Sequence, residues 1–173
     1  MLTLSRLKPL RRVGRGFTLV ELMVVVAVMA IGASLAAPDL SRMVANYRIR
    51  GEAEALLGGL NLARAEAVRR NGAVTFALQP ASAGWEVRQV SPATSLENYS
   101  NASASSVTLV SGSASTAVTF LSTGVLQAGS QLSQVTVASN LPGTNTRRIS
   151  IFGGGLIRMC DPAQTAANDP RRC

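Results

Sequence analysis

The sequence contains no histidine, and its cysteines are only two, Cys160 and Cys173. Histidine is the commonest general base and metal ligand, so its absence argues against acid–base catalysis and against a zinc site built with two cysteines. We find no Walker-type glycine loop, no G-x-S-x-G motif and no carboxylate pair spaced for acid–base chemistry. The sequence therefore predicts a protein that is not an enzyme and uses no catalytic residue, metal or cofactor.

Charged residues are also scarce, at 15%, and positive charge is concentrated at the N-terminus. The chain has a formal net charge of +8, from 17 basic and 9 acidic residues. Residues 1–16 carry no acid and five of the basic residues, and without them the formal charge falls to +3. The basic residues in this leader are Arg6, Lys8, Arg11, Arg12 and Arg15. Charge alone therefore gives only weak support for nucleic-acid binding.

A long apolar segment follows the leader. Residues 17–37 form a run of 21 residues with a single charge, Glu21. As a helix this run would be about 32 Å long, enough to cross the hydrocarbon core of a bilayer. The positive-inside rule places the basic leader in the cytoplasm and everything after Ala37 across the membrane.

The same residues also fit a secretory signal peptide cut near residues 34–36, or an uncleaved signal anchor. Glu21 argues against both alternatives. It lies about 6 Å along the helix from Phe17. Placing a carboxylate in an apolar membrane segment is energetically unfavourable, and neither a signal peptide nor a signal anchor requires one. A third interpretation, in which Glu21 has a partner, explains the residue better.

The run R-G-F-T-L-V-E-L at residues 15–22 resembles the class III signal of type IV pilins and type II secretion pseudopilins. The resemblance implies that a prepilin peptidase cuts after Gly16 and methylates Phe17. It also implies that Glu21 pairs with the terminal amine of a neighbouring subunit. The pairing is chemically sensible, because cleavage creates a cation at Phe17 that a carboxylate would neutralise among packed apolar helices.

The helix is expected to continue beyond the membrane to residue 72. Pro38 predicts a kink or a locally melted turn, with the helix resuming at Asp39. Asn71 and Gly72 predict the C-terminal stop. We interpret Gly58-Gly59 as close packing against a sheet, with a functional hinge as the alternative. The apolar residues expected to face the rest of the domain recur at helical spacing: Met43, Val44, Tyr47, Leu56, Leu57, Leu60, Ala63 and Ala67.

The remainder predicts seven short strands with glycine-rich turns. Alternation predicts the first at residues 74–78, and the second is expected at residues 84–87, with Trp85 as a core anchor. The other five are expected at residues 107–110, 117–121, 132–138, 147–152 and 156–160. Residues 91–106, rich in serine and asparagine, predict an exposed loop.

Residues 60–78 resemble the helix end and first strand of the FimT/FimU/GspH branch of this family. The predicted fold class is α+β, with a long N-terminal helix, half transmembrane and half amphipathic, packed on a small antiparallel β-sheet or β-sandwich head, as in the lollipop shape of type IV pilins. The expected organisation is a leader at 1–16, a transmembrane helix at 17–37, an amphipathic helix at 38–72 and a periplasmic head at 73–173.

The C-terminal tail is expected to be closed by a disulfide. In an oxidising compartment the two cysteines, Cys160 and Cys173, should pair and contribute about 3 kcal/mol in the chain-entropy model. The surrounding residues also resemble the C-terminus of many FimT/FimU-type proteins. The bridge is expected mainly to stop the tail from fraying. Alternatively, four arginines present cations to DNA or to another minor pilin: Arg147, Arg148, Arg171 and Arg172.

The resemblance implies a minor pilin that helps to initiate and cap a type IV pilus. The alternatives are a minor pseudopilin of type II secretion, the H-type, and a DNA-binding subunit at the pilus tip. The implied partners are prepilin peptidase, other pilins or pseudopilins, and the bacterial inner membrane. The protein would cross that membrane once, with its head in the periplasm, and become extracellular in the pilus.

Overall fold

The computed structural model describes residues 16–79, 84–100, 107–129 and 131–173. The chain divides into two compact units, residues 1–38 and residues 39–173. The long helix α1 (Leu19–Arg69) contributes to both units. The basic leader side chains, from Arg6 to Arg15, lie outside the described residues, as do residues 101–106 of the expected loop.

The described part of the first unit, residues 16–38, is almost entirely helical, and every residue in it is exposed. Helical structure runs without interruption across Pro38, so the expectation of a locally melted turn there is wrong. A proline removes only one backbone donor, and the hydrogen bonds of the neighbouring turns hold the helix on either side. The expected kink at Pro38 stays a prediction.

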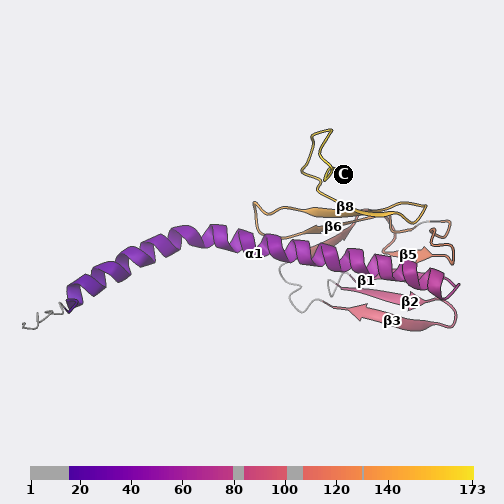
Figure 1. Ribbon diagram of the computed structural model, residues 1–173, viewed down its shortest axis with the longest axis horizontal. Helices are drawn as coiled ribbons and strands as arrows, with labels where there is room; N and C mark the ends of the chain where they lie inside the picture. Colours follow the sequence, from indigo (N-terminus) through magenta and orange to yellow (C-terminus); the bar gives the residue numbers. More distant parts are fainter. Residues whose placement is uncertain (1–15, 80–83, 101–106, 130) are drawn as a thin grey trace, which may run out of the picture. The chain divides into compact units, whose positions relative to one another are not determined.

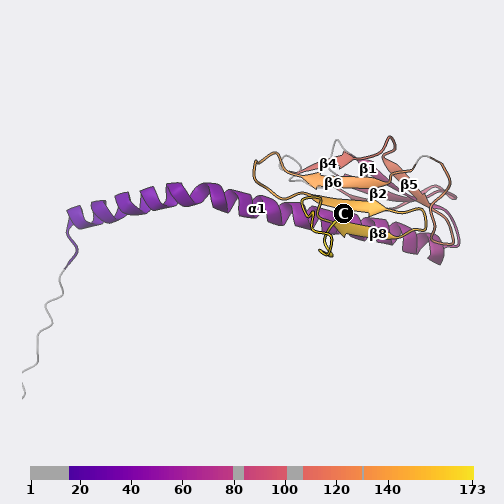
Figure 2. The ribbon, with the colours of Figure 1, turned by 90° about the horizontal axis from the view of Figure 1, so that it is seen from above.

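The second unit contains two antiparallel sheets of four strands each. In the first sheet the order is β3-β2-β1-β5, with β1 (Val74–Gln79), β2 (Gly84–Gln89), β3 (Thr94–Tyr99) and β5 (Ala117–Phe120). In the second it is β4-β6-β7-β8, with β4 (Thr108–Ser111), β6 (Gln134–Ala138), β7 (Arg147–Ile151) and β8 (Ile157–Cys160). The part of α1 that belongs to this unit packs along both sheets (Figures 1 and 2). The predicted α+β class, with the helix packed on antiparallel sheets, is confirmed.

The strand β3 was not expected, because residues 91–106 were predicted to form a loop. It pairs with β2 from Gln89↔Thr94 to Trp85↔Tyr99 and forms the edge of its sheet. Most of its residues are exposed, so the alternation of apolar and polar residues that marks a half-buried strand is missing. Tyr99 anchors one end, with its ring stacked on Trp85 at 5.3 Å between centroids and its hydroxyl donating to Glu52 Oε1 at 3.0 Å.

The core joins one face of α1 to both sheets. From α1 come Ile49, Ala53, Leu56, Leu60, Ala63 and Ala67; from the first sheet Val74, Phe76, Leu78, Trp85, Val87, Val118 and Phe120; from the second Val135, Val137, Ile149 and Ile151. The expected apolar face is wrong at its beginning, because Met43, Val44 and Tyr47 are 52%, 43% and 65% exposed. Residues on the same helix face as Leu56 recur every three or four positions toward the N-terminus, and in this part of the helix they are Ile49 and Ala45. These two residues are buried.

Gly59 shapes the packing of α1, and Asn71 with Gly72 shapes its end. A Cβ atom on Gly59 would lie 2.8 Å from the Trp85 ring, so the absence of a side chain lets the indole lie directly on the helix. This agrees with close packing at Gly59 and with Trp85 as a core anchor, whereas Gly58 has open space around its Cα. The helix ends in a Schellman motif, with Asn71 at φ 49° and the Gly72 N–H donating to the Ala67 carbonyl at 3.1 Å.

Candidate functional site

The predicted processing site lies at the N-terminal end of α1. The Thr18 hydroxyl caps the helix by accepting the Glu21 N–H at 3.2 Å, and the Thr18 carbonyl accepts the Leu22 N–H at 3.1 Å. Thr18 and Glu21 have the T-x-x-E spacing of a capping box. Thr18 was not among the residues predicted from the sequence to have a role, although this spacing identifies it as the residue that starts the helix.

A pocket of about 420 Å³ lies at the same end, lined by Gly16, Phe17, Thr18 and Glu21. The Phe17 side chain is 80% exposed, and Gly16 has open space around its Cα. Glu21 lies in the first turn of the helix, where the helix dipole favours a carboxylate. The structure therefore brings Gly16, Phe17 and Glu21 together, with the bond between Gly16 and Phe17 directly before the helix.

The apolar surface that follows Glu21 is uncovered. One 18-residue window of α1 has a mean hydropathy of 2.4, and none of it is buried. Its large exposed side chains include Leu22, Met23, Val24, Val25, Val26, Val28, Met29, Ile31 and Leu35. By length and composition this segment can cross a membrane, and a continuous apolar surface of this size marks a membrane or protein contact.

The C-terminal tail forms a closed loop. Cys160 and Cys173 are joined by the expected disulfide, with their Cα atoms 5.0 Å apart. Arg158, which was not among the predicted site residues, holds the loop against β8 by donating to the carbonyls of Pro170 at 2.9 Å and Arg172 at 3.0 Å. Its place two residues before Cys160 puts it on the strand that carries the bridge, and the sequence contains no stronger sign of this role.

The four arginines proposed as contact residues differ in their surroundings. Arg147 forms an ion pair with Asp161, and Arg171 pairs with Asp169 at 2.8 Å, which holds the pKa of the Asp169 carboxyl below its usual value. Both arginines line one pocket of about 370 Å³ beside the disulfide, which Arg148 and Arg172 do not line. The Nε atom of Arg148 is buried without a hydrogen-bond partner among the described residues, and Arg172 is exposed.

Within the described residues, no group of three or more histidine, cysteine, aspartate or glutamate side chains is placed to hold a metal ion. The features that the structure does assemble are a capped helix start with a glutamate in its first turn, an apolar helix surface and a disulfide-closed loop. Each is suited to processing or to contact with other molecules.

Comparison with known proteins agrees with these features. The family model for the type II transport protein GspH matches residues 52–155, more than half of the chain, and the prokaryotic N-terminal methylation motif matches residues 11–37. No curated protein sequence matches the chain.

Two crystal structures of the type IV minor pilin FimU from Pseudomonas aeruginosa PAO1 are similar in fold. Both are 21% identical to this chain, with TM-scores of 0.54 and 0.51. The matches cover 70% and 68% of this chain and 94% and 97% of the FimU chains. At this identity the similarity shows a shared fold. Together with the match to the GspH model, it leads to the conclusion that the chain belongs to the GspH family of type IV pilin-like proteins.

Proposed function

We propose that this chain is a minor pilin that takes part in initiating and capping a type IV pilus. The observation that carries the proposal is the arrangement at residues 16–21, where an exposed glycine–phenylalanine bond precedes a capped apolar helix with Glu21 in its first turn. The FimU-like fold of the head supports the same role. The role is structural, and no reaction is assigned to the chain.

In this proposal prepilin peptidase cuts after Gly16 and methylates the new N-terminus at Phe17. The apolar helix holds the protein in the inner membrane, with the head on the periplasmic side, until assembly moves the helix into a bundle of similar helices. In that apolar interior a lone carboxylate is costly, so Glu21 and the terminal ammonium of a neighbouring subunit stabilise each other. Other minor and major pilins are therefore the partners.

Deletion of the gene in its own cell tests the proposal. We expect surface pili to fall strongly in number, and we expect the wild-type chain to restore them when it is supplied again. Electron microscopy and the yield of sheared pili measure this. A deletion strain with normal pili would contradict the proposal.

A minor pseudopilin of type II secretion is the second candidate, and the match to the GspH model over residues 52–155 favours it. The same deletion strain separates the two candidates. Loss of protein export with normal pili would support the pseudopilin, whereas loss of pili with normal export would support the minor pilin. Neighbouring genes for a pilus or for a secretion machine provide an independent indication.

A role in DNA binding has narrower support. Arg172 is exposed, but Arg147 and Arg171 are already paired with Asp161 and Asp169. A salt titration of the full chain in detergent with short duplex DNA tests it. Loss of the Arg171 and Arg172 side chains should flatten the dependence of log affinity on log salt by up to about two, one for each lost phosphate contact. Absence of binding at about 50 mM salt would remove the DNA role.

A further inference from the structure

Two tight turns lie side by side at the end of the head where α1 finishes (Figure 1). The first turn follows β5, and in it the Leu121 N–H donates to the Val125 carbonyl at 2.9 Å. The second joins β7 to β8, and in it the Phe152 N–H donates to the Leu156 carbonyl at 2.9 Å. Neither the processing of Phe17 nor the disulfide-closed loop involves these turns.

The two turns are fixed against each other and against α1. A Cβ on Gly155 would collide with the Gly124 carbonyl oxygen, so the turns can approach this closely only because residue 155 is glycine. Both glycines have positive φ, 80° at Gly155 and 78° at Gly124. Arg64 of α1 donates from Nε to the same Gly124 carbonyl at 3.1 Å. The turns are therefore held in place before any partner binds, which lowers the entropic cost of association.

The turns present large apolar side chains to solvent. Phe152 and Leu156 are 49% and 59% exposed. Val68 of α1 lies beside the first turn, with Cγ2 3.3 Å from the position that a Cβ on Gly124 would take. We refer to the exposed apolar residues on and beside the two turns as the turn cluster: Val68, Leu121, Val125, Phe152 and Leu156. Exposed apolar side chains gathered on a rigid surface mark a contact with another protein.

The cation beside the turn cluster has no carboxylate partner among the described residues. Arg64 is half-buried, and the described chain uses one of its five N–H donors, the one at Nε. Glu66, the acid nearest to Arg64 in the sequence, pairs with Arg69 and Arg70. Charge-assisted hydrogen bonds to a carboxylate are the strongest that a guanidinium forms in proteins. Arg64 is therefore suited to a carboxylate that comes from outside the chain.

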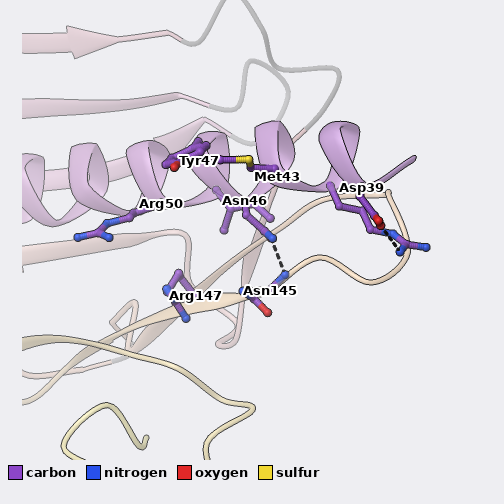
Figure 3. A pocket seen from close by; sticks show the side chains of 9 residues that line it. Asp39, Met43, Asn46, Tyr47, Arg50, Asn145 and Arg147 are labelled. Atoms are coloured by element: carbon purple, nitrogen blue, oxygen red, sulfur yellow. Dashed lines mark hydrogen bonds and ion pairs between the residues drawn. The ribbon is translucent and has the colours of Figure 1, made fainter. Parts of the chain in front are cut away.

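A pocket of about 400 Å³ beside the first turns of α1 after residue 38 shows the contrast (Figure 3). Each arginine that lines it already contacts a carboxylate: Arg42 with Asp39 at 3.3 Å, Arg50 with Glu54 at 2.8 Å, and Arg147 with Asp161. The cations of this pocket are thus neutralised within the chain. They give no reason to expect an anionic partner, whereas Arg64 does.

We propose that the turn cluster and Arg64 form a docking surface for a segment of another pilin subunit that carries a carboxylate between apolar side chains. The carboxylate pairs with Arg64, and the apolar side chains beside it cover Phe152 and Leu156. A free anion would satisfy the guanidinium but leave these side chains in water, so a protein segment fits both parts of the surface. The inference rests on the proposed function, because it takes the partner to be a subunit of the same filament.

Photo-cross-linking in the intact cell tests the surface. The full chain is produced with Phe152→benzoylphenylalanine, and ultraviolet light joins this side chain to the protein that it touches. We expect one main product, whose partner peptide contains aspartate or glutamate and belongs to a subunit with its own N-terminal methylation motif. Val110→benzoylphenylalanine is the matched control, because Val110 is 55% exposed and lies on β4, which β6 separates from β7.

Further substitutions test the chemistry of the contact. Leu156→Ser and Arg64→Gln should each reduce the cross-linked product by about tenfold or more, because a few central residues supply most of the binding energy of an interface. Arg64→Gln also removes the hydrogen bond to Gly124, so circular dichroism must show that it folds, whereas Leu156 is exposed and its substitution leaves the head intact. Lysine in place of the mapped partner carboxylate should lower the product as well, and Arg64→Glu should then restore it.

Four outcomes would overturn the inference. They are no product from position 152, an equally abundant product from position 110, an unchanged yield in Leu156→Ser, and a partner peptide that has no acidic residue or comes from a protein that is not a pilin-like subunit. A chain that enters pili but shows one of these outcomes contradicts the docking surface alone. A chain that never enters pili contradicts the proposed function.

Discussion

The two halves of α1 form one continuous helix but have opposite surroundings. From Leu19 to Val44 every residue is exposed, although most are apolar. From Ala45 to Ala67 one side of the helix is buried, with successive buried residues one, three or four positions apart: Ala45, Ile49, Glu52, Ala53, Leu56, Gly59, Leu60, Ala63 and Ala67. The second half is covered by the protein's own sheets, whereas the first half has no cover within the described chain.

This difference separates folding from assembly. Burial of apolar surface stabilises the second half within the head, and large-to-small changes there leave cavities. Residues 19–37 include no buried residue, so their sequence is explained by what lies outside the chain, either lipid or other helices. Glu21 is the one charge in residues 17–37, and it should therefore matter for contacts with other subunits and not for stability of the head.

The largest expected effect is at Glu21. In Glu21→Ala we expect incorporation into filaments to be lost, because the partner of this carboxylate lies on another subunit, whereas membrane insertion should persist in a more apolar helix. Fractionation of sheared pili measures incorporation. Glu97→Ala, an exposed glutamate on β3, is the control and should assemble normally. Normal incorporation of the Glu21 variant would break the comparison between the halves.

A pair of leucines compares the halves directly in terms of stability. Leu56 is 0% exposed and Leu35 is 74% exposed. We expect Leu56→Ala to lower the free energy of unfolding of the head by about 2–5 kcal/mol, and Leu35→Ala to change it by less than about 0.5 kcal/mol. Fluorescence of the single tryptophan, Trp85, reports on unfolding of the full chain in detergent. Similar effects from the two variants would contradict the account.

The neighbouring glycines sharpen the comparison within the packed half. A Cβ on Gly59 would meet the Trp85 ring at 2.8 Å, so Gly59→Ala should destabilise the head by about 1–3 kcal/mol. Gly58 has open space around its Cα, so Gly58→Ala should stabilise the helix by up to about 1 kcal/mol. Thermal unfolding followed by circular dichroism should give shifts of opposite sign. Shifts of the same sign would show that the indole does not fix this contact.

The smallest expected effect concerns the end of the packed half. Hydrogen bonds from Arg69 and Arg70 lower the pKa of Glu66 from 4.5 to about 2. A lowered pKa in the folded state stabilises the protein above about pH 4.5, and this contribution is lost as the pH falls through about 2. Glu66→Gln should therefore have a lower unfolding temperature than wild type at pH 7, and the difference should vanish near pH 2. A constant difference over this range would contradict the pKa shift.

Much of the fold could be predicted from local patterns. Alternation marked β1, the apolar run marked the first half of α1, and the turn residues separated most of the later strands. The strand β3 could not be predicted, because both of its faces are largely exposed and its anchor, Tyr99, depends on Trp85 and Glu52 from other elements. The prediction of which helix face is buried near Tyr47 was wrong, because two sets of apolar residues overlap in this part of the helix. Only the set at helical spacing from Leu56 is buried.

The candidate site shows the same limits. The motif around Gly16 and Glu21 was identified by its resemblance to the class III signal, and its residues lie close together because they are neighbours in the sequence. The pairing of Arg147 with Asp161, and of Arg171 with Asp169, depends on how the disulfide-closed loop folds. From the sequence alone all four arginines were treated as cations available for a partner. The structure shows that two of the four already have carboxylate partners.

The most direct test of the account is the intact mass of the chain recovered from sheared filaments. We predict the mass of residues 17–173 plus one methyl group, with the disulfide formed between Cys160 and Cys173. This result would place a processed subunit inside the fibre. A filament-associated chain that still carries residues 1–16, or a mature form that begins at Ala37 or Pro38, would contradict the central claim.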